Sequence, residues 1–283
     1  MSSITEVKAG RYTIRGVSVG GVYTCLQVPE IGALFDAGVA LRGLVGGEHL
    51  FLSHGHADHM GGLVGLLGIR GIQERPRLRA FMPRAIHAGI ASALEHMTGM
   101  HRFDLSMDIV PVDPGDEHQL RSDLHVRALK AHHVVPTLGY QFFNRVKRLK
   151  PAFQGLSGPE IAQRRRAGDD LFDEGERLEL AYVTDTLLRV IDTSPSLLKT
   201  PVLILECTFL DERRSPERAH KSCHIHLDDL LPRAEEFENE HLVLMHLSQL
   251  YKPAEVHAIL RRRLPASLYA RVVPFAPQSG GWL

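Results

Sequence analysis

Short apolar runs of strand length and amphipathic stretches of helical spacing follow one another along the whole chain. The short runs predict strands at 21–28, 33–36, 49–53, 79–82, 109–112, 124–130, 139–145, 178–184, 202–207, 242–246 and 268–275. Helical spacing predicts helices at 60–69, 83–100, 159–167, within 227–238 and at 253–263. Strands and hairpins dominate the first half, and strands alternate with helices in the second. The pattern therefore favours a layered α/β protein over a strictly wound parallel sheet.

One segment interrupts this regular pattern. Residues 145–170 begin with basic side chains and then become helix-like. The sequence contains no internal repeat and no Pro/Gly/Ser-rich linker that would divide it. We therefore expect a single domain over 1–283, with a basic excursion at about 145–170.

Composition narrows the class of protein. Lys+Arg and Asp+Glu are 33 each among the 283 residues, so the formal net charge is zero and any contact with nucleic acid must be local. The three cysteines, Cys25, Cys207 and Cys223, lie far apart, which argues against a disulfide framework and a thiolate zinc site. The first residues lack the layout of a signal peptide, and no apolar run approaches the ~20 residues that span a bilayer. These features predict a cytoplasmic protein without a membrane contact.

The segment Phe51-Leu-Ser-His-Gly-His-Ala-Asp-His-Met-Gly-Gly62 carries the most specific chemistry. His54, His56, Asp58 and His59 all follow directly after a predicted strand. Alternate residues of a strand share a face, so His54 and His56 are delivered to the same side. Nitrogen and carboxylate donors without thiolate suit Zn²⁺, and Mn²⁺ or Fe²⁺ are alternatives. One loop of this kind can serve two neighbouring ions.

Such a pair of ions needs further ligands from distant parts of the chain. Three candidates follow the ends of predicted strands: His133 after 124–130, Asp185 after 178–184, and His246 at the end of 242–246. His132 precedes His133 directly and is an alternative ligand. Each candidate alone is weak evidence, because a strand-end His or Asp often serves only as a hydrogen-bonding residue.

The motif His54-x-His56-x-Asp58-His59 resembles the signature of metallo-β-lactamase-fold hydrolases. Later segments resemble, in order, the motifs of ribonuclease Z, the tRNA 3′-processing endonuclease, and the opening stretch 16–36 looks most like the short plant-type and related bacterial members. These segments are His133-Val-Val-Pro-Thr-Leu-Gly-Tyr140, Tyr182-Val-Thr-Asp-Thr186, Leu205-Glu-Cys-Thr-Phe209, Cys223-His-Ile-His226 and His246-Leu-Ser-Gln-Leu-Tyr251. The resemblance covers nearly the whole chain. It implies a four-layer αββα sandwich, with two mixed sheets face to face and helices outside.

The resemblance also implies a centre of two zinc ions. His54, His56 and His133 would hold the first ion, and Asp58, His59 and His246 the second, with Asp185 bridging the two. His133 rather than His132 takes the ligand position, because the residues after it then match the family motif. Two ions of this kind lower the pKa of a water between them toward neutrality. Asp58 is expected to be a catalytic residue as well as a ligand.

Hydrolysis of a phosphodiester also benefits from an acid that protonates the departing oxygen. The resemblance assigns this role to His224, oriented by Glu206, since a carboxylate beside an imidazole favours its charged form. His226 receives only a supporting role. Ser248 and Tyr251 are expected to shape or contact the substrate phosphate.

Two basic patches qualify the choice of substrate. Arg145, Lys147, Arg148 and Lys150 form the first, and Arg164, Arg165 and Arg166 the second. Both flank a segment that resembles the substrate-proximal region of the family, so Arg164 and Arg165 are expected to contact RNA phosphates. A solvated helix face explains the same pattern without RNA.

The sequence also departs from the family pattern. The Gly-Thr-Gly and Pro-x-Lys-x-Arg-Asn segments of many bacterial members are absent, and Cys223 stands where glycine is usual. The arm that grips the tRNA elbow is expected to be short or missing, with only about 147–157 available. These departures affect the predicted substrate more than the predicted metal centre.

The sequence leaves three functions to be compared. The leading hypothesis is a zinc-dependent endoribonuclease that removes the 3′ trailer from precursor tRNA. The second retains the metal centre but acts on a small phosphodiester, a cyclic nucleotide or an ester. The third is a non-catalytic subunit, in which the metal ions only stabilise the fold. The resemblance also suggests a homodimer, with the apolar helix at 62–69 either in the interface or in the core.

Overall fold

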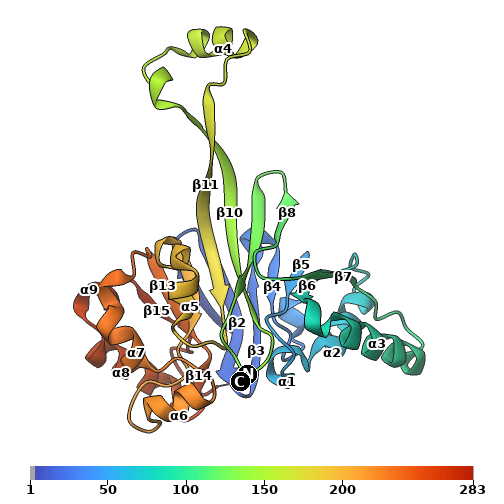
Figure 1. Ribbon diagram of the computed structural model, residues 1–283. Coiled ribbons are helices and arrows are strands. Elements are labelled where there is room, and N and C mark those ends of the chain that lie inside the picture. The colour runs from blue at the N-terminus through green and yellow to red at the C-terminus, as the bar shows by residue number, and fades with distance from the viewer. Residues whose placement is uncertain (1–3, 283) are drawn as a thin grey trace.

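Two mixed β-sheets face each other in the computed structural model, which describes residues 4–282 (Figure 1). The first sheet has the order β1-β2-β3-β4-β5-β6-β7, with β14 added alongside β2. Its strands are β1 Thr5–Ala9, β2 Tyr12–Gly20, β3 Tyr23–Val28, β4 Ala33–Phe35, β5 His49–Phe51, β6 Arg79–Pro83, β7 Asp108–Val112 and β14 Leu247–Ser248. The second sheet has the order β15-β13-β12-β11-β10-β9-β8. Its strands are β8 Glu117–Arg121, β9 Leu124–Lys130, β10 Leu138–Leu149, β11 Phe172–Val183, β12 Val202–Glu206, β13 His241–Met245 and β15 Val272–Pro274.

Helices cover the outer face of each sheet, so the expected four-layer αββα arrangement is confirmed. The α-helices are α1 Ala57–Met60, α2 Leu63–Ile72, α3 Arg84–His101, α4 Gly158–Arg166, α5 Val190–Thr193, α6 Pro216–Lys221, α7 Leu227–Leu230, α8 Pro253–Arg263 and α9 Ala266–Tyr269. Short 3₁₀ helices are η1 Pro29–Ile31, η2 Arg42–Leu44, η3 Pro151–Phe153, η4 Pro195–Lys199 and η5 Leu231–Glu236. Helices α2 and α3 pack on the first sheet, whereas α5, α7 and α8 pack on the second. Among residues 4–282, no helix has the length and hydropathy to cross a membrane.

Aromatic side chains fill the space between the two sheets. Phe35 of the first sheet stacks on Tyr182 of the second, with ring centroids 4.4 Å apart. Phe51 meets Phe142 edge to face at 5.1 Å across the same layer. All four side chains are fully buried, and burying a side chain of this size is worth about 1.5–3 kcal/mol. This core fixes the two sheets relative to each other, and therefore also fixes the loops at their ends.

Parallel pairing places the carboxyl ends of many strands at one edge. Strands β4 to β7 run parallel in the first sheet, and β11, β12, β13 and β15 run parallel in the second. The loops that follow these strands therefore meet at one rim of the sandwich. Residues from both halves of the sequence can meet at this rim, although they are far apart in the chain.

Most sequence predictions of secondary structure are confirmed, and the differences have local causes. The helix expected at 60–69 is divided into α1 and α2 at Gly61 and Gly62. Position 62 requires glycine, because a Cβ there would lie 2.5 Å from the carbonyl carbon of Val39. The strand expected at 268–275 is wrong in its first part, which forms α9. Strands β1, β2, β8 and β14 and helices α5 and α6 were not predicted. Helix α2 buries Leu66 and Leu67, so this apolar face belongs to the core.

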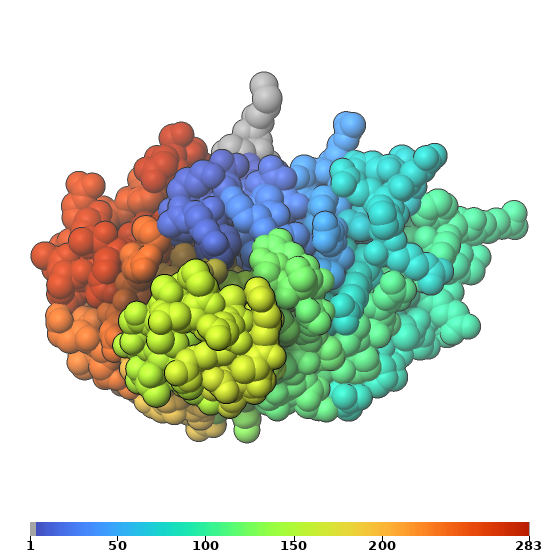
Figure 2. All heavy atoms as spheres, turned by 90° about the horizontal axis from the view of Figure 1, so that it is seen from above, coloured from blue at the N-terminus to red at the C-terminus, as the bar shows by residue number. Residues whose placement is uncertain are grey.

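The basic excursion is a long arm, and the expectation of a short or missing arm is wrong. Strands β10 and β11 stay paired out to Leu149 and Phe172, while β9 accompanies β10 only as far as Phe143. The outer part is thus a two-stranded ribbon that projects from the sandwich and carries η3 and α4 at its tip (Figure 1). Viewed from the tip, the arm stands in front of the two halves of the molecule (Figure 2). Local propensity does not reveal such a ribbon, because its strands bury little apolar surface.

Candidate metal centre

The rim at the carboxyl ends of the strands holds a cluster of imidazole and carboxylate groups. His54 follows β5, Asp185 follows β11, and His246 follows β13. His133 lies in the loop between β9 and β10, and His56, Asp58 and His59 lie at the start of α1. All seven residues that the sequence nominates as ligands therefore come together from both sheets.

Four side chains form the first group of donors. One ligand atom from each of His54, His56, His133 and Asp185 lies within 4.8 Å of the others. His54 Nε2 and His133 Nε2 each lie 3.7 Å from Asp185 Oδ2. His133 Nε2 lies 3.3 Å from His56 Nδ1. This is a nitrogen-rich pocket with one carboxylate oxygen at its edge.

A second group lies on the other side of Asp185. Asp58, His59 and His246 again bring one ligand atom each within 4.8 Å of one another. His59 Nε2 and His246 Nε2 lie 3.2 and 3.3 Å from Asp185 Oδ1. Asp185 thus presents Oδ2 to the first group and Oδ1 to the second, the arrangement needed for a carboxylate shared by two cations.

Backbone strain accompanies this convergence. Asp185 has φ of 43° and His246 has φ of 58°, both in the left-handed region that residues with a Cβ seldom adopt. Such conformations cost of order 1–3 kcal/mol each and persist where the surroundings enforce them. The short turns after β11 and β13 therefore aim these side chains at the cluster at an energetic cost.

Burial and charge set the protonation of the donors. Burial, reinforced by neighbouring imidazoles, lowers the pKa of His54 to about 2, so its ring is neutral and keeps a lone pair. Burial alone would raise the pKa of Asp185, but His246 and His59 hold it well below its usual range. Burial would lower the pKa of His59, yet Asp185 and Asp36 raise it well above normal. The cluster therefore combines ionised carboxylates with positions that favour positive charge.

The donor set fits divalent metal ions. His54 Nε2 is buried and has no hydrogen-bond partner among the residues that the structure describes. An unpaired buried nitrogen is costly unless another ligand satisfies it. The cluster contains nitrogen and oxygen donors and no thiolate, a set that suits zinc or a similar cation. The residues could hold one ion in each group.

Asp36 supports the cluster from behind and was not predicted. Its fully buried carboxylate accepts hydrogen bonds from the Ser53 backbone N–H at 2.7 Å and from the Tyr182 hydroxyl at 2.6 Å. Its Oδ2 also lies 2.7 Å from Nδ1 of His59, which leaves Nε2 of that ring directed at the second group. Asp36 follows β4 directly, so the strand-end rule that nominated the other donors could have found it.

A second network lies beside the cluster. His224 Nδ1 lies 3.0 Å from Glu206 Oε1, and the other oxygen of Glu206 accepts a hydrogen bond from the Thr208 hydroxyl at 2.6 Å. Thr208 Oγ1 also lies 3.0 Å from Nδ1 of His246, so it links the two networks. Burial lowers the pKa of His224, but Glu206 outweighs this and raises it to about 9. His224 is therefore protonated at neutral pH.

The two other histidines considered from the sequence, His132 and His226, do not belong to either group of donors. His132 turns away from the cluster, and its Nε2 lies 3.0 Å from the Thr193 hydroxyl. The buried ring of His226 accepts a hydrogen bond from the Asp228 backbone N–H and caps α7. These two histidines stabilise the surrounding loops.

The residues expected to contact the substrate lie in three different places: one is buried in the core, one lies at the rim and two lie on the arm. The expected contact by Tyr251 is wrong, because its side chain is fully buried and its hydroxyl accepts a hydrogen bond from the Leu210 N–H at 2.8 Å. Ser248 is 8% exposed at the rim. Arg164 and Arg165 lie on α4 at the tip of the arm, at the opposite end of the molecule from α1 (Figure 1).

Comparison with known proteins identifies the class first. The Beta-lactamase superfamily domain matches residues 33–247. Among solved structures, the metallo-β-lactamase fold protein YhfI from Bacillus subtilis superposes with a TM-score of 0.59 at 15% identity, covering 94% of this chain and 96% of that one. The human short form of tRNase Z gives a TM-score of 0.56 at 16% identity, covering 82% and 92%. The chain is a hydrolase of the β-lactamase superfamily, with a His/Asp cluster that could bind metal.

Sequence relatives then identify the family. The chain is 34% identical to tRNase Z TRZ1 of Arabidopsis thaliana over 92% of this chain and 94% of that protein. It is 31% identical to the chloroplastic tRNase Z TRZ2 of the same plant over 95% and 76%. The chain therefore belongs to the ribonuclease Z family of hydrolytic endoribonucleases.

Proposed function

We propose that this protein removes the 3′ trailer from precursor tRNA by zinc-dependent hydrolysis of one phosphodiester bond. The observation that carries the proposal is the convergence of seven donor side chains from both sheets beside His224, whose Nδ1 lies 3.0 Å from Glu206 Oε1. The names of the relatives, tRNase Z and ribonuclease Z, supply the substrate class.

In this proposal, His54, His56 and His133 would hold one ion, and Asp58, His59 and His246 would hold the other. Asp185 lies between the two groups and would be a ligand of both. When bound, the two ions supply Lewis-acid chemistry: they neutralise charge on the phosphate and lower the pKa of a water. The buried, hydrogen-bonded surroundings keep these side chains in place before any ion arrives.

His224 acts as the general acid. In hydrolysis, water loses one proton to the solvent, its oxygen bonds to phosphorus, and the bond from phosphorus to the 3′ oxygen of the tRNA breaks. That oxygen departs with a proton from His224, leaving a 3′-hydroxyl on the tRNA and a 5′-phosphate on the trailer. Glu206 orients the His224 ring through Nδ1, so Nε2 carries the proton toward the substrate.

The arm adds a contact at a distance from the rim. Arg164 and Arg165 stand at its tip, where they would bind tRNA phosphates without reading sequence. Arg164 is also held by Asp169, with its Nη1 3.3 Å from Oδ2. The rim and the arm would thus bind different parts of one RNA, whether they belong to one protein molecule or to two neighbouring copies of it.

The test is incubation with a 3′-extended tRNA transcript followed by mapping of both product ends. We expect cleavage after the acceptor stem with the ends given above, and loss of cleavage on chelation that zinc restores. His56→Ala should lose at least one metal by elemental analysis and nearly all activity. His96→Ala, at an exposed position of α3, is the matched control and should keep both. If the protein hydrolysed bis(p-nitrophenyl) phosphate but left precursor tRNA uncleaved, this result would instead support the small-phosphodiester alternative.

A further inference from the structure

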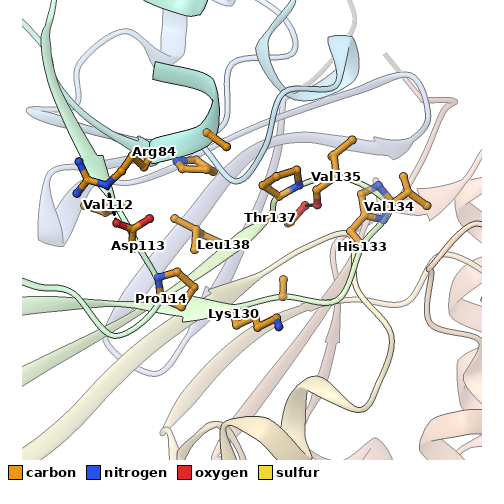
Figure 3. A pocket seen from close by; sticks show the side chains of 14 residues that line it. Arg84, Val112, Asp113, Pro114, Lys130, His133, Val134, Val135, Thr137 and Leu138 are labelled. Carbon is orange, nitrogen blue, oxygen red and sulfur yellow. Dashed lines mark hydrogen bonds and ion pairs between the residues drawn. The ribbon is translucent and has the colours of Figure 1, made fainter. Parts of the chain in front are cut away.

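A cleft opens next to the cluster on the outer side of His133 (Figure 3). Its volume is about 380 Å³, and its walls come from the start of α3, the end of β7, the end of β9 and the loop 131–138. Figure 3 shows His133 at one end of the cleft and Arg84 with Asp113 toward the other. Small-ligand sites begin at about 300 Å³, so the cleft is large enough for a nucleotide-sized group.

The charges of this cleft favour an anion. Lys130 lines it, is exposed, and forms no ion pair with any residue in the range 4–282. Arg84, by contrast, has its Nε 2.5 Å from Asp113 Oδ2, so these two largely cancel each other. The positive charge of Lys130 is therefore not balanced by a carboxylate, in a cleft that His133 also lines. A hollow at the opposite ends of the strands differs, because its Arg11 is paired with Glu179.

The remaining wall is apolar and does not read sequence. Val134 lines the cleft and has 61% of its surface exposed. Pro114 and Pro136 add flat apolar surface. The Thr137 hydroxyl donates to the carbonyl of Val135 and is not free to recognise a base edge. The cleft therefore suits ribose and base faces of any sequence.

The position of His224 indicates which part of the RNA substrate enters the cleft. The His224 ring lies 5.4 Å from the ring of His133 and 5.3 Å from that of His246, so it belongs to the cluster side of His133 and not to the cleft wall. If His224 protonates the departing 3′ oxygen, the tRNA end lies on that side. The phosphate that remains on the trailer then lies toward His133, and the next nucleotides continue past it.

We propose that the cleft is the trailer subsite: it binds the first nucleotides of the 3′ trailer, with Lys130 contacting their backbone phosphate. This inference rests on the proposed function. A trailer of several nucleotides should bind more tightly than a single nucleotide, independent of its base sequence.

The experiment measures KM for one precursor tRNA carrying either a single-nucleotide or a longer trailer. In the wild-type protein we expect a lower KM for the longer trailer. Lys130→Glu should raise KM several-fold for the longer trailer and leave the single-nucleotide substrate and kcat nearly unchanged. Lys199→Glu, an exposed lysine before β12 at the other end of the strands, is the matched control and should behave like wild type. Val134→Asp tests the apolar wall independently and should act like Lys130→Glu.

A direct binding assay gives a readout that does not depend on turnover. A 5′-phosphorylated, 3′-fluorescein-labelled oligouridylate should bind the wild-type protein in fluorescence anisotropy. Its slope of log affinity against log salt should fall by about 0.7 in Lys130→Glu, the value for one phosphate contact on a single strand.

The possible outcomes separate the two proposals. Precursor cleavage with a trailer effect that survives Lys130→Glu and Val134→Asp would refute the trailer subsite alone. A KM that rises equally for both trailers, with weaker binding of mature tRNA, would place the acceptor end in the cleft and also overturn it. An uncleaved precursor would instead remove the proposed function.

Discussion

Replacing Asp36 by asparagine tests how the metal cluster is held. The carboxylate of Asp36 is fully buried and accepts hydrogen bonds from Ser53 and Tyr182 while its Oδ2 contacts Nδ1 of His59 at 2.7 Å. Asparagine matches the shape of the side chain, and it tolerates the φ of 57° found there. The change therefore removes charge and one acceptor while leaving the backbone conformation accessible.

The expected magnitude follows from these contacts. The amide NH₂ of the variant must face one of the donors that the carboxylate accepted, so one charge-assisted hydrogen bond worth about 1.5–3 kcal/mol is lost. The ring of His59 loses the anion that orients it. Groups that orient metal-ligating histidines typically contribute 10–100-fold in metal affinity, which corresponds to about 1.4–2.8 kcal/mol.

The assay compares unfolding with and without zinc. The free energy of unfolding measured in the presence of a chelator reports the lost hydrogen bond. The increase in this free energy when zinc is added reports the affinity of the folded protein for zinc, because a ligand that binds only the folded state stabilises it by mass action. Asp36→Asn should lower both quantities. Tyr182→Phe, which removes one donor but keeps the carboxylate, should lower them less. If Asp36→Asn bound zinc as tightly as the wild type, the role of Asp36 in orienting His59 would be wrong.

Four further substitutions test other parts of the structure. Glu206 raises the pKa of His224 to about 9, so Glu206→Gln should lower that pKa. His224 then loses its proton at a lower pH, and the alkaline fall of kcat should move to lower pH. Bound zinc should be retained. Gly38→Ala would place a methyl carbon 1.8 Å from a carbonyl oxygen of α1, so we expect the free energy of unfolding in chemical denaturation to fall by more than about 3 kcal/mol. Gly68 of α2 has open space around it, so Gly68→Ala should raise the free energy of unfolding by up to about 1 kcal/mol. Trp282→Phe removes the 2.7 Å hydrogen bond from the indole N–H to a backbone carbonyl in the loop after β14, and should lower the unfolding midpoint slightly; an unchanged midpoint would show that this contact contributes nothing.

The seven proposed ligands show how far sequence reasoning reaches. Four of them stand within six residues after one strand, where spacing alone predicts which side chains share a face. The other three, His133, Asp185 and His246, were nominated because each follows a predicted strand. The ends of these three strands were predicted to within one residue, at 130, 184 and 246 against the observed 130, 183 and 245.

Other features depended on contacts that the local pattern does not contain. The orientation of His132 away from the cluster is set by its hydrogen bond to Thr193, which lies on another element. The burial of Tyr251 is set by the packing of its ring under the loop around Leu210. The arm likewise depends on the pairing of two strands more than twenty residues apart, since Leu149 pairs with Phe172.

The donor chemistry, the alternation of strands and helices, and the family resemblance could be inferred from the amino-acid sequence, because these are properties of residue type and short-range spacing. The folded molecule was needed to show that the strand ends share one rim, that Asp36 contacts His59, and that a cleft lined by Lys130 opens beside His133. These features arise from sheet order and from packing between residues distant in the chain, and no local pattern encodes them.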